Sequence, residues 1–322
     1  MSDPDRDANS TYLLASLQWL RSRLERLIDK SKVKATTLTR QKKAMQAAEN
    51  SDPPPAVVQL HRAFGLSPFE QEILFLCVAM ELDIAIADLC AQAQNNANRP
   101  YPTFALCLSL FEDPIWDALL PGRPLRYWRL LEVAQPGASP LLISPLKADE
   151  RIANYFKGLN ELDNRLADLL FPLILPSNDL PTTPPLAPSQ QQTLQTIARY
   201  LERDLHRPQL PLIQLLGTDT TSKKQIAYEI ASGFGLPLYR LLIELLPAQT
   251  ADLKRLVRLW QREHRLNPIA LYLNAQALTG PAPTSDTALA LRYLLSSSSG
   301  MVFLDAADRS LSLDRGSRRC LW

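Results

Sequence analysis

Hydrophobic residues near the start of the chain recur at the spacing of one helical face. Within residues 11–30, leucines alternate at steps of four and three, at Leu13, Leu17, Leu20, Leu24 and Leu27. This pattern predicts an amphipathic helix. Because the stripe covers only about two heptads, the helix could pack on its own domain or on a partner helix. The basic stretch Lys30 to Lys43 is typical of a solvated helix end and linker, so residues 1–55 are expected to form an N-terminal arm.

Short helical patterns follow in residues 56–175, which we expect to form one domain. Gly65 ends one helix, and Ser67 with Pro68 begins the next as N-cap and first-turn residue. That helix, residues 69–81, is apolar on most sides and should be central. Further helices are expected at residues 83–93 and, after an N-cap at Thr103, at residues 104–110.

Two extended runs come after these helices. Residues 125–133 and 141–143, on either side of a Pro-Gly turn, predict a β-hairpin. Three helices followed by a hairpin is the plan of a winged helix, which is a helix-turn-helix with an appended wing. Helices are expected again at residues 149–157 and 164–170.

Five prolines in residues 176–189 predict a linker between two domains. Helices and buried strands then alternate, which predicts a parallel sheet in an α/β domain over residues 190–322. The expected helices are 190–205, 222–234, 251–265 and 286–295, and the expected strands are 210–216, 238–243, 269–273 and 301–304. The fold class expected for the chain is therefore mainly helical and α/β, with a winged-helix domain before an incomplete P-loop-type parallel domain.

The first of these strands runs into a segment with the length and position of a phosphate-binding P-loop, Gly-x4-Gly-Lys-Ser/Thr. Gly217 and Lys223 match this pattern, and the N-terminus of the following helix attracts phosphate. Ser222 replaces the second glycine and adds a Cβ where the backbone must approach the ligand. Lys224 replaces the hydroxyl residue that would bind Mg²⁺. Gly217, Ser222 and Lys223 are therefore candidates for weak ATP binding, and no metal is expected.

Hydrolysis of ATP also needs acidic residues at a strand end, one to hold Mg²⁺ and a following glutamate to activate water. The third strand ends instead in Asn274 and Ala275. Asp305, after the fourth strand, is a weaker alternative because Ala306 stands where the base should be. We therefore expect no catalytic residues in this chain.

Charge restricts the partners further. A net charge of +2 gives no general attraction to nucleic acids or membranes, and a hydrophobic content of 46% excludes a chain that is disordered throughout. Between Gly65 and Gly122, Arg99 alone opposes eight acidic residues, for a local balance of −7. Residues 103–110, the would-be recognition helix, contain no Lys, Arg, Asn or Gln to contact DNA. Contact with proteins is expected instead.

Further features indicate a cytoplasmic protein that does not insert into a membrane. The acidic start lacks the basic and apolar regions of a signal peptide, and the uncharged run 266–285 is too polar to span a bilayer. The three histidines have no metal-ligand spacing. The cysteines are expected to be reduced, three of them in apolar helical patterns, and they are Cys77, Cys90, Cys107 and Cys320.

Several segments resemble a group of bacterial AAA-type ATPases. The most specific is Phe64-Gly65-Leu66-Ser67-Pro68-Phe69-Glu70, and the resemblance extends over residues 57–305. Members of the group carry this winged-helix region, then a degenerate first ATPase module and then a competent second one. Some are encoded beside contractile injection systems, which implies a role in remodelling or assembly.

The chain departs from this group after the fourth strand. It stops at Trp322, so the resemblance implies that the remaining sheet strand, the helical lid and the second module are missing. Such a chain would be a natural short form or a truncated gene product.

Three functions are compatible with these features. The first is a non-catalytic AAA-related subunit for docking or assembly, with AAA-family or injection-system proteins as partners. The second is the N-terminal portion of an active AAA remodelling enzyme. The third, a winged-helix regulator that binds DNA, rests on the fold alone.

Overall fold

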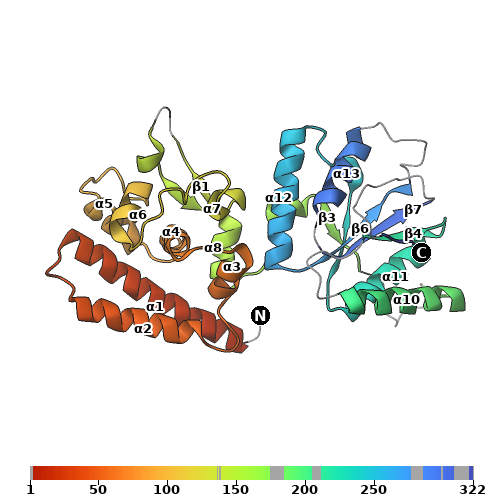
Figure 1. Ribbon diagram of the computed structural model, residues 1–322, viewed down its shortest axis with the longest axis horizontal. Coiled ribbons are helices and arrows are strands. Elements are labelled where there is room, and N and C mark those ends of the chain that lie inside the picture. The colour runs from red at the N-terminus through yellow and green to blue at the C-terminus, as the bar shows by residue number, and fades with distance from the viewer. Residues whose placement is uncertain are drawn as a thin grey trace. The chain divides into compact units, whose positions relative to one another are not determined.

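The protein forms two compact units, one from Met1 to Glu161 and the other from Leu162 to Trp322 (Figure 1). The structure is a computed structural model that describes residues 3–135, 137, 139–174, 185–204, 212–276, 286–298, 300–307 and 319–321. Helices dominate the first unit, and the second contains a mainly parallel sheet with helices on both faces. The expected class, mainly helical with α/β, is confirmed.

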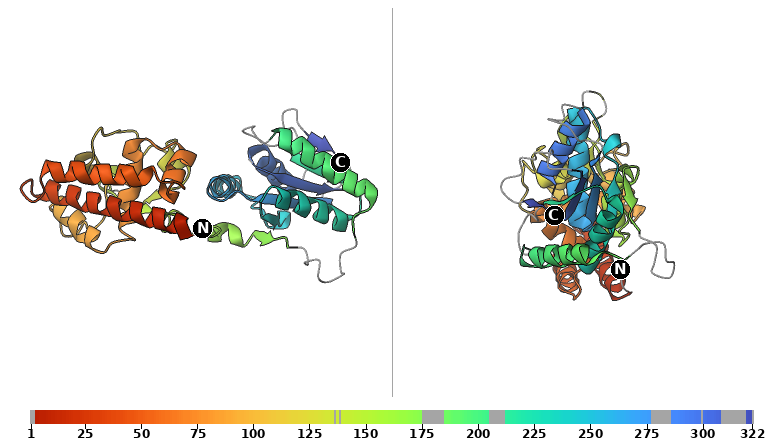
Figure 2. Two further views of the ribbon diagram at one scale, coloured as in Figure 1. Left: turned by 90° about the horizontal axis from the view of Figure 1, so that it is seen from below. Right: turned by 90° about the vertical axis from the view of Figure 1, so that its right-hand side faces the viewer.

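The first unit opens with two long helices, α1 (Asp3–Ile28) and α2 (Ala35–Glu49), which lie side by side (Figures 1 and 2). Leu20 and Leu24 of the predicted stripe are fully buried. Part of the basic stretch expected to be a linker begins α2 instead. Because α1 contacts α2 and other helices of the same unit, the helix packs on its own domain.

Asn9 shows how α1 is tied to the rest of the unit. Its side-chain amide donates a hydrogen bond to the carbonyl oxygen of Phe156 (2.7 Å), and its side-chain oxygen accepts one from the backbone N–H of Ala56 (3.1 Å). The residue is buried, so both bonds are shielded from water. They fix the start of α1 against two other segments of the unit.

The next four helices follow the predicted caps. They are α3 (Ala56–Phe64), α4 (Pro68–Ala79), α5 (Ala85–Ala93) and α6 (Phe104–Leu110). Gly65 ends α3 with φ at 62°, and Ser67 forms a reciprocal capping box with Glu70. Thr103 caps α6 by accepting a hydrogen bond from the N–H of Leu106 (3.1 Å). The helix expected to be central, α4, is buried along most of its length.

The hairpin is present, but its strands differ from the expected ones. They are β1 (Leu131–Val133) and β2 (Leu146–Ala148), which pair antiparallel. The two predicted runs begin instead with the short helix α7 (Pro124–Tyr127) and the 3-10 turn η1 (Leu141–Ile143). The prediction of extended structure was wrong there; in α7, Pro124 stands at the first helical position, which favours a helical turn.

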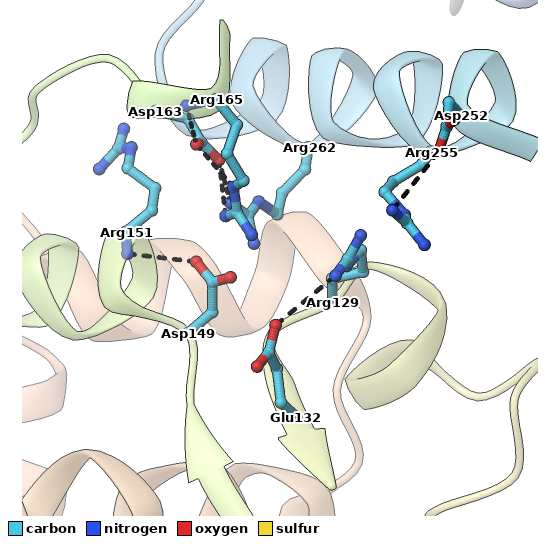
Figure 3. Close-up of polar contacts among 9 residues, drawn as sticks. All are labelled: Arg129, Glu132, Asp149, Arg151, Asp163, Arg165, Asp252, Arg255 and Arg262. Atoms are coloured by element: carbon cyan, nitrogen blue, oxygen red, sulfur yellow. Dashed lines mark hydrogen bonds and ion pairs between the residues drawn. The ribbon is translucent and has the colours of Figure 1, made fainter. Parts of the chain in front are cut away.

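The chain passes from the first unit to the second between Glu161 and Leu162, earlier than the expected boundary at residue 175. The helix α8 (Glu150–Phe156), capped by Asp149, is the last element of the first unit (Figure 3). Beyond it, α9 (Asn164–Ala167) contacts α12 (Thr250–Leu266) of the second unit, and β3 (Leu170–Pro172) pairs antiparallel with β5 (Leu238–Leu241). The residues before the expected linker therefore already belong to the second sheet.

The second unit has the predicted alternation of helices and strands. Its further strands are β4 (Leu212–Leu216), β6 (Ala270–Asn274), β7 (Val302–Ala306) and β8 (Arg319–Leu321). The helices between them are α10 (Pro188–Asp204), α11 (Thr220–Gly233), α12 (Thr250–Leu266) and α13 (Asp286–Ser297), and the 3-10 turn η2 (Ile243–Leu245) follows β5. The strand order is β3-β5-β6-β7-β4-β8, with every pairing parallel except β3 with β5.

Helices cover both faces of this sheet (Figure 2). One face packs against α12 and α13, and the other packs against α10 and α11. The strands β6 and β7 are buried along almost their full length, as expected for the middle of a parallel sheet.

Two expectations about the ends of this unit have different outcomes. The strand expected to be missing is present, because β8 pairs parallel with β4. Most of the predicted linker, residues 176–189, lies outside the described residues, and α10 begins at Pro188.

Candidate functional site

The loop after β4 is the centre of the candidate site. β4 lies between β7 and β8, yet the chain continues through α11 to β5 on the far side of β6. In an open parallel sheet such a change of direction leaves a crevice at the carboxyl ends of the strands, where ligands bind. Gly217 stands there with φ at 117°, a conformation that favours glycine. The backbone therefore has the strand-loop-helix form that the sequence predicts.

Lys223 points into the protein from the first turns of α11. It is only 5% exposed, and its Nζ donates hydrogen bonds to the carbonyl oxygens of Gly217 (2.6 Å) and Ala306 (3.3 Å). The same nitrogen forms an ion pair with the carboxylate of Asp305. The positive charge of Lys223, which would attract a phosphate, is therefore already paired with Asp305 inside the unit.

Asp305 is fully buried at the end of β7, and its carboxylate has several donors around it. The hydroxyl of Tyr272 donates to Oδ2 (2.6 Å), and the side-chain amide of Gln276 donates to Oδ1 (3.0 Å). Burial, followed by the bond to Asp305, raises the pKa of Tyr272 well above its usual range, so it remains a donor. Asp305 therefore acts here as the anion of a satisfied buried network, with Lys223 as its cation.

Gln276 joins this network to the loop. Its amide nitrogen also lies 2.9 Å from Oγ1 of Thr220 and 3.4 Å from the carbonyl oxygen of Gly217. No motif in the sequence marks Gln276 as a site residue, although it follows directly after Asn274 and Ala275. Asn274 is exposed, and its side chain accepts a bond from the backbone N–H of Gln276 (3.1 Å).

The N-terminus of α11 is capped by a carboxylate. Asp219 accepts hydrogen bonds from the N–H of Ser222 (3.1 Å) and from its hydroxyl (2.5 Å). These bonds, that of the hydroxyl first, lower the pKa of Asp219, so it is ionised at neutral pH. A negative charge therefore occupies the position where a phosphate would bind to free N–H groups. The sequence contains a signal for this role, because aspartate is one of the preferred residues at the N-cap of a helix.

The predicted site residues are thus brought together only in part. Lys223 contacts both Gly217 and Asp305, whereas Ser222 faces the capping carboxylate of Asp219. Within the described residues, no group of three or more His, Cys, Asp or Glu side chains could hold a metal ion. Chemically, the arrangement is a set of polar groups that satisfy one another.

The would-be recognition helix of the first unit, α6, is largely covered. Phe104, Leu106, Cys107 and Leu110 are buried, and α1 and η1 contact the helix. Arg23 of α1 donates to the carbonyl oxygen of Leu110 and pairs with Glu112 at 3.0 Å. None of the seven residues of α6 is Lys, Arg, Asn or Gln, the types that contact phosphates and base edges in the major groove.

The cysteines described here have the expected environment. Cys77, Cys90 and Cys107 are buried, unpaired thiols, and burial raises the pKa of each. The side chain of Cys320 lies outside the described residues. Among the helices described, none is both long and apolar enough to cross a membrane.

Comparison with known proteins bears on the first unit and the first residues of the second. Residues 30–170 match the family model of a winged helix domain, variant. No curated protein matches the chain. The match begins within the helical pair at the N-terminus, upstream of the expected domain start at residue 56. Residues 30–170 are therefore similar to a winged helix domain, as the helices and hairpin predict.

Proposed function

We propose that the protein is a non-catalytic subunit for docking or assembly, related to AAA ATPases, that binds nucleotide weakly at most. The observation that carries this proposal is the buried ion pair of Lys223 with Asp305. To contact a phosphate, Lys223 would have to leave Asp305 without a cation. Leaving one charge of a buried pair uncompensated costs about 3–5 kcal/mol, which would be subtracted from the binding energy of the nucleotide.

The capping carboxylate weakens the site further. A phosphate at the N-terminus of α11 would displace or face Asp219, which carries the same sign of charge. The residue after Asp305 is Ala306, which has no carboxylate. An attacking water would therefore lack a general base, which commonly contributes about 10²–10⁴-fold to a rate.

Isothermal titration with ATP, with and without Mg²⁺, combined with a phosphate-release assay, tests this proposal. We expect affinity no tighter than high micromolar, little change on adding Mg²⁺, and no turnover above background. The variants are Lys223→Met and, as a matched control on the same helix, Lys224→Ala. Magnesium-dependent hydrolysis that disappears in Lys223→Met but persists in Lys224→Ala would overturn the proposal.

An additional variant keeps the result interpretable. Asp219→Asn removes the negative charge at the helix N-terminus but retains a side chain that can cap it. If the carboxylate blocks anions, this variant should bind inorganic phosphate more tightly than the unmodified protein. Equal binding by both proteins would contradict the part of the argument that rests on Asp219.

The resemblance to AAA-type ATPases supports an alternative, in which this chain is the N-terminal portion of an active remodelling enzyme. Gly217 and Lys223, at the carboxyl edge of the sheet, favour it. Reading the DNA downstream of the gene separates the two proposals. A second ATPase module in frame beyond position 322 would favour the enzyme.

The match to a winged helix domain supports a second alternative, a regulator that binds DNA. The covered helix α6 and the local balance of −7 weigh against it. A mobility-shift titration with duplex DNA should show no salt-sensitive binding at physiological ionic strength. Micromolar or tighter binding that weakens steeply with salt would support the regulator.

A further inference from the structure

A large aromatic side chain stands on the surface of the first unit, between α6 and α7. Trp116 is 72% exposed, and Leu120, four residues later, is 55% exposed. Single exposed apolar residues are common on protein surfaces, but tryptophan is the type most enriched among residues that dominate binding at interfaces. Two such side chains four residues apart therefore mark a candidate contact surface for another molecule.

Trp116 does not stand on a flexible base. Its ring contacts Phe104 edge to face at 6.3 Å between centroids, and Phe104 contacts Phe69 at 6.4 Å. Phe69 in turn contacts Phe111, whose ring stacks on Trp19 of α1. This chain of rings connects the exposed indole to the buried core. An anchor that is already ordered loses little entropy when a partner binds.

Backbone hydrogen bonds hold the same segment in consecutive turns. The N–H of Ala118 donates to the carbonyl oxygen of Ile115 (3.2 Å), and the N–H of Leu120 donates to that of Asp117 (2.9 Å). A third bond runs from the N–H of Arg123 to the carbonyl oxygen of Leu120 (2.9 Å). The two exposed apolar side chains are therefore presented from a fixed backbone.

Three acidic residues flank these side chains in the sequence. Glu112, Asp113 and Asp117 are all exposed, and the side chain of Asp117 remains 52% exposed. Cations lie near two of them: Arg23 and Lys42 near Glu112, and Arg123 at 3.9 Å from Asp117. No ion pair is described for Asp113. The segment thus combines apolar anchors with negative charge that local cations neutralise only in part.

From this combination we infer that the Trp116 surface (Glu112, Asp113, Trp116, Asp117 and Leu120) binds a basic, amphipathic segment of another protein. An apolar side chain of that segment packs on Trp116 and Leu120, and its Lys or Arg residues face the three carboxylates. Charge complementarity specifies the partner, since an acidic segment would be repelled and a purely apolar one would leave the carboxylates desolvated. This inference rests on the proposed docking function and gives it a location.

Selection of peptides displayed on phage, carried out against the full chain, tests the inference. The library consists of random 16-residue peptides, and the most enriched peptide is then synthesised for fluorescence anisotropy titration. We expect enriched peptides to carry net positive charge with at least one aromatic or large aliphatic residue. Their affinity should fall as the salt concentration rises, because exposed charges are screened.

Substitutions locate the binding site. Trp116→Ala should weaken binding at least tenfold, as loss of a central tryptophan does at other interfaces. Leu120→Ala should weaken it by a smaller factor, and its matched control is Leu289→Ala, a residue of equal exposure (55%) in the second unit that should change nothing. Asp113→Asn with Asp117→Asn should reduce both affinity and its salt dependence.

The outcomes separate this inference from the proposed function. Peptides that bind equally well to Trp116→Ala would overturn the Trp116 surface but leave a docking role elsewhere on the chain. A selection without any enriched peptide would also overturn it. Magnesium-dependent hydrolysis of ATP, measured separately, would instead overturn the proposed function. Thermal unfolding of each variant confirms that the substituted chains remain folded, which is expected because the substituted side chains are exposed.

Discussion

Two buried aspartates of the second unit each hold a cation, but in different places. Asp305 holds Lys223 at the carboxyl edge of the sheet, where a P-loop protein would bind phosphate. Asp163 holds Arg262 of α12 and Arg165, just after the chain enters this unit (Figure 3). Asp305 pairs with the lysine that a phosphate would contact, whereas Asp163 holds a connecting segment to a helix. A buried ion pair therefore engages a candidate ligand-binding lysine in one case and holds a segment to a helix in the other.

The largest effect is expected from breaking the pair at the sheet edge. Asp305→Ala should lower the free energy of unfolding by about 3–5 kcal/mol, because Lys223 is left buried without an anion. Urea unfolding followed by tryptophan fluorescence measures this loss. The double variant Lys223→Met with Asp305→Leu should be less destabilised than the single variant, since it buries no unpaired charge. A double variant that unfolds more readily than Asp305→Ala would contradict this account.

Breaking the other pair should cost less. Asp163→Ala should lower the free energy of unfolding by about 2–3 kcal/mol, because it leaves the buried Arg262 without this anion, whereas the loss of Asp305 also deprives Tyr272 and Gln276 of an acceptor. Arg165 is a partly exposed partner of Asp163, so its own loss matters less. The same urea titration compares the two variants directly. A greater loss for Asp163→Ala than for Asp305→Ala would reverse the order proposed here.

Acid should affect Asp163 in a defined direction. Burial raises its pKa, but the bond from Arg165 and the charge of Arg262 outweigh burial and leave the pKa below the usual 3.8. The pair therefore contributes fully above pH 3.8 and is lost as the pH falls through the lower value in the folded protein. The difference in stability between the unmodified protein and Asp163→Asn should shrink as an acid titration takes the pH below 3.8.

Glu72 of the first unit provides the opposite case, a carboxyl group that burial leaves short of compensating charge. Burial raises its pKa from 4.5 to about 7, although Arg23 and Lys42 lie nearby. Because the folded protein favours the protonated form, stability should decline as the pH rises from 4.5 to about 7. Glu72→Gln should therefore stabilise the protein at pH 8 by about 1–2 kcal/mol and have little effect at low pH. Equal effects at both values would contradict the cause given.

The smallest effect concerns a helix cap. Ser67→Ala should cost about 1 kcal/mol, because the N–H of Glu70 loses its acceptor at the start of α4. Ser109→Ala, in an exposed position of α6, is a suitable control and should change stability by less. Thermal unfolding of both variants gives the comparison. A cost for Ser67→Ala as large as that of Asp305→Ala would mean that the capping box does more than satisfy the helix end.

Local signals in the sequence predicted the helices well, because each cap depends on residues a few positions apart. Ser67 with Glu70, Thr103 with Leu106 and Gly65 after Phe64 were all readable in this way. The hairpin strands were placed less well. β1 and β2 have only three residues each, too few to show a period of two, and proline began a helical turn where an extended run was expected.

The backbone of the candidate site could be predicted from the sequence, but the ion pair of Lys223 with Asp305 could not. Strand, glycine and helix follow one another in the sequence, so the loop of Gly217 could be foreseen. Lys223 and Asp305 are 82 positions apart, and Gln276 reaches Asp305 from the end of another strand. Whether a lysine is available for a ligand depends on which carboxylate lies beside it in space, and no local pattern reports that distance.

The position of β4 has a consequence for the order in which the protein folds during synthesis. The strand's partners are β7 and β8, which the ribosome makes about ninety and more residues later. When translation reaches residue 300, the first unit is complete, but β4 still has two unpaired edges. Non-local pairing of this kind is slow, and open strand edges invite aggregation. A stalled or prematurely ended nascent chain should therefore release a folded first unit joined to an aggregation-prone second one.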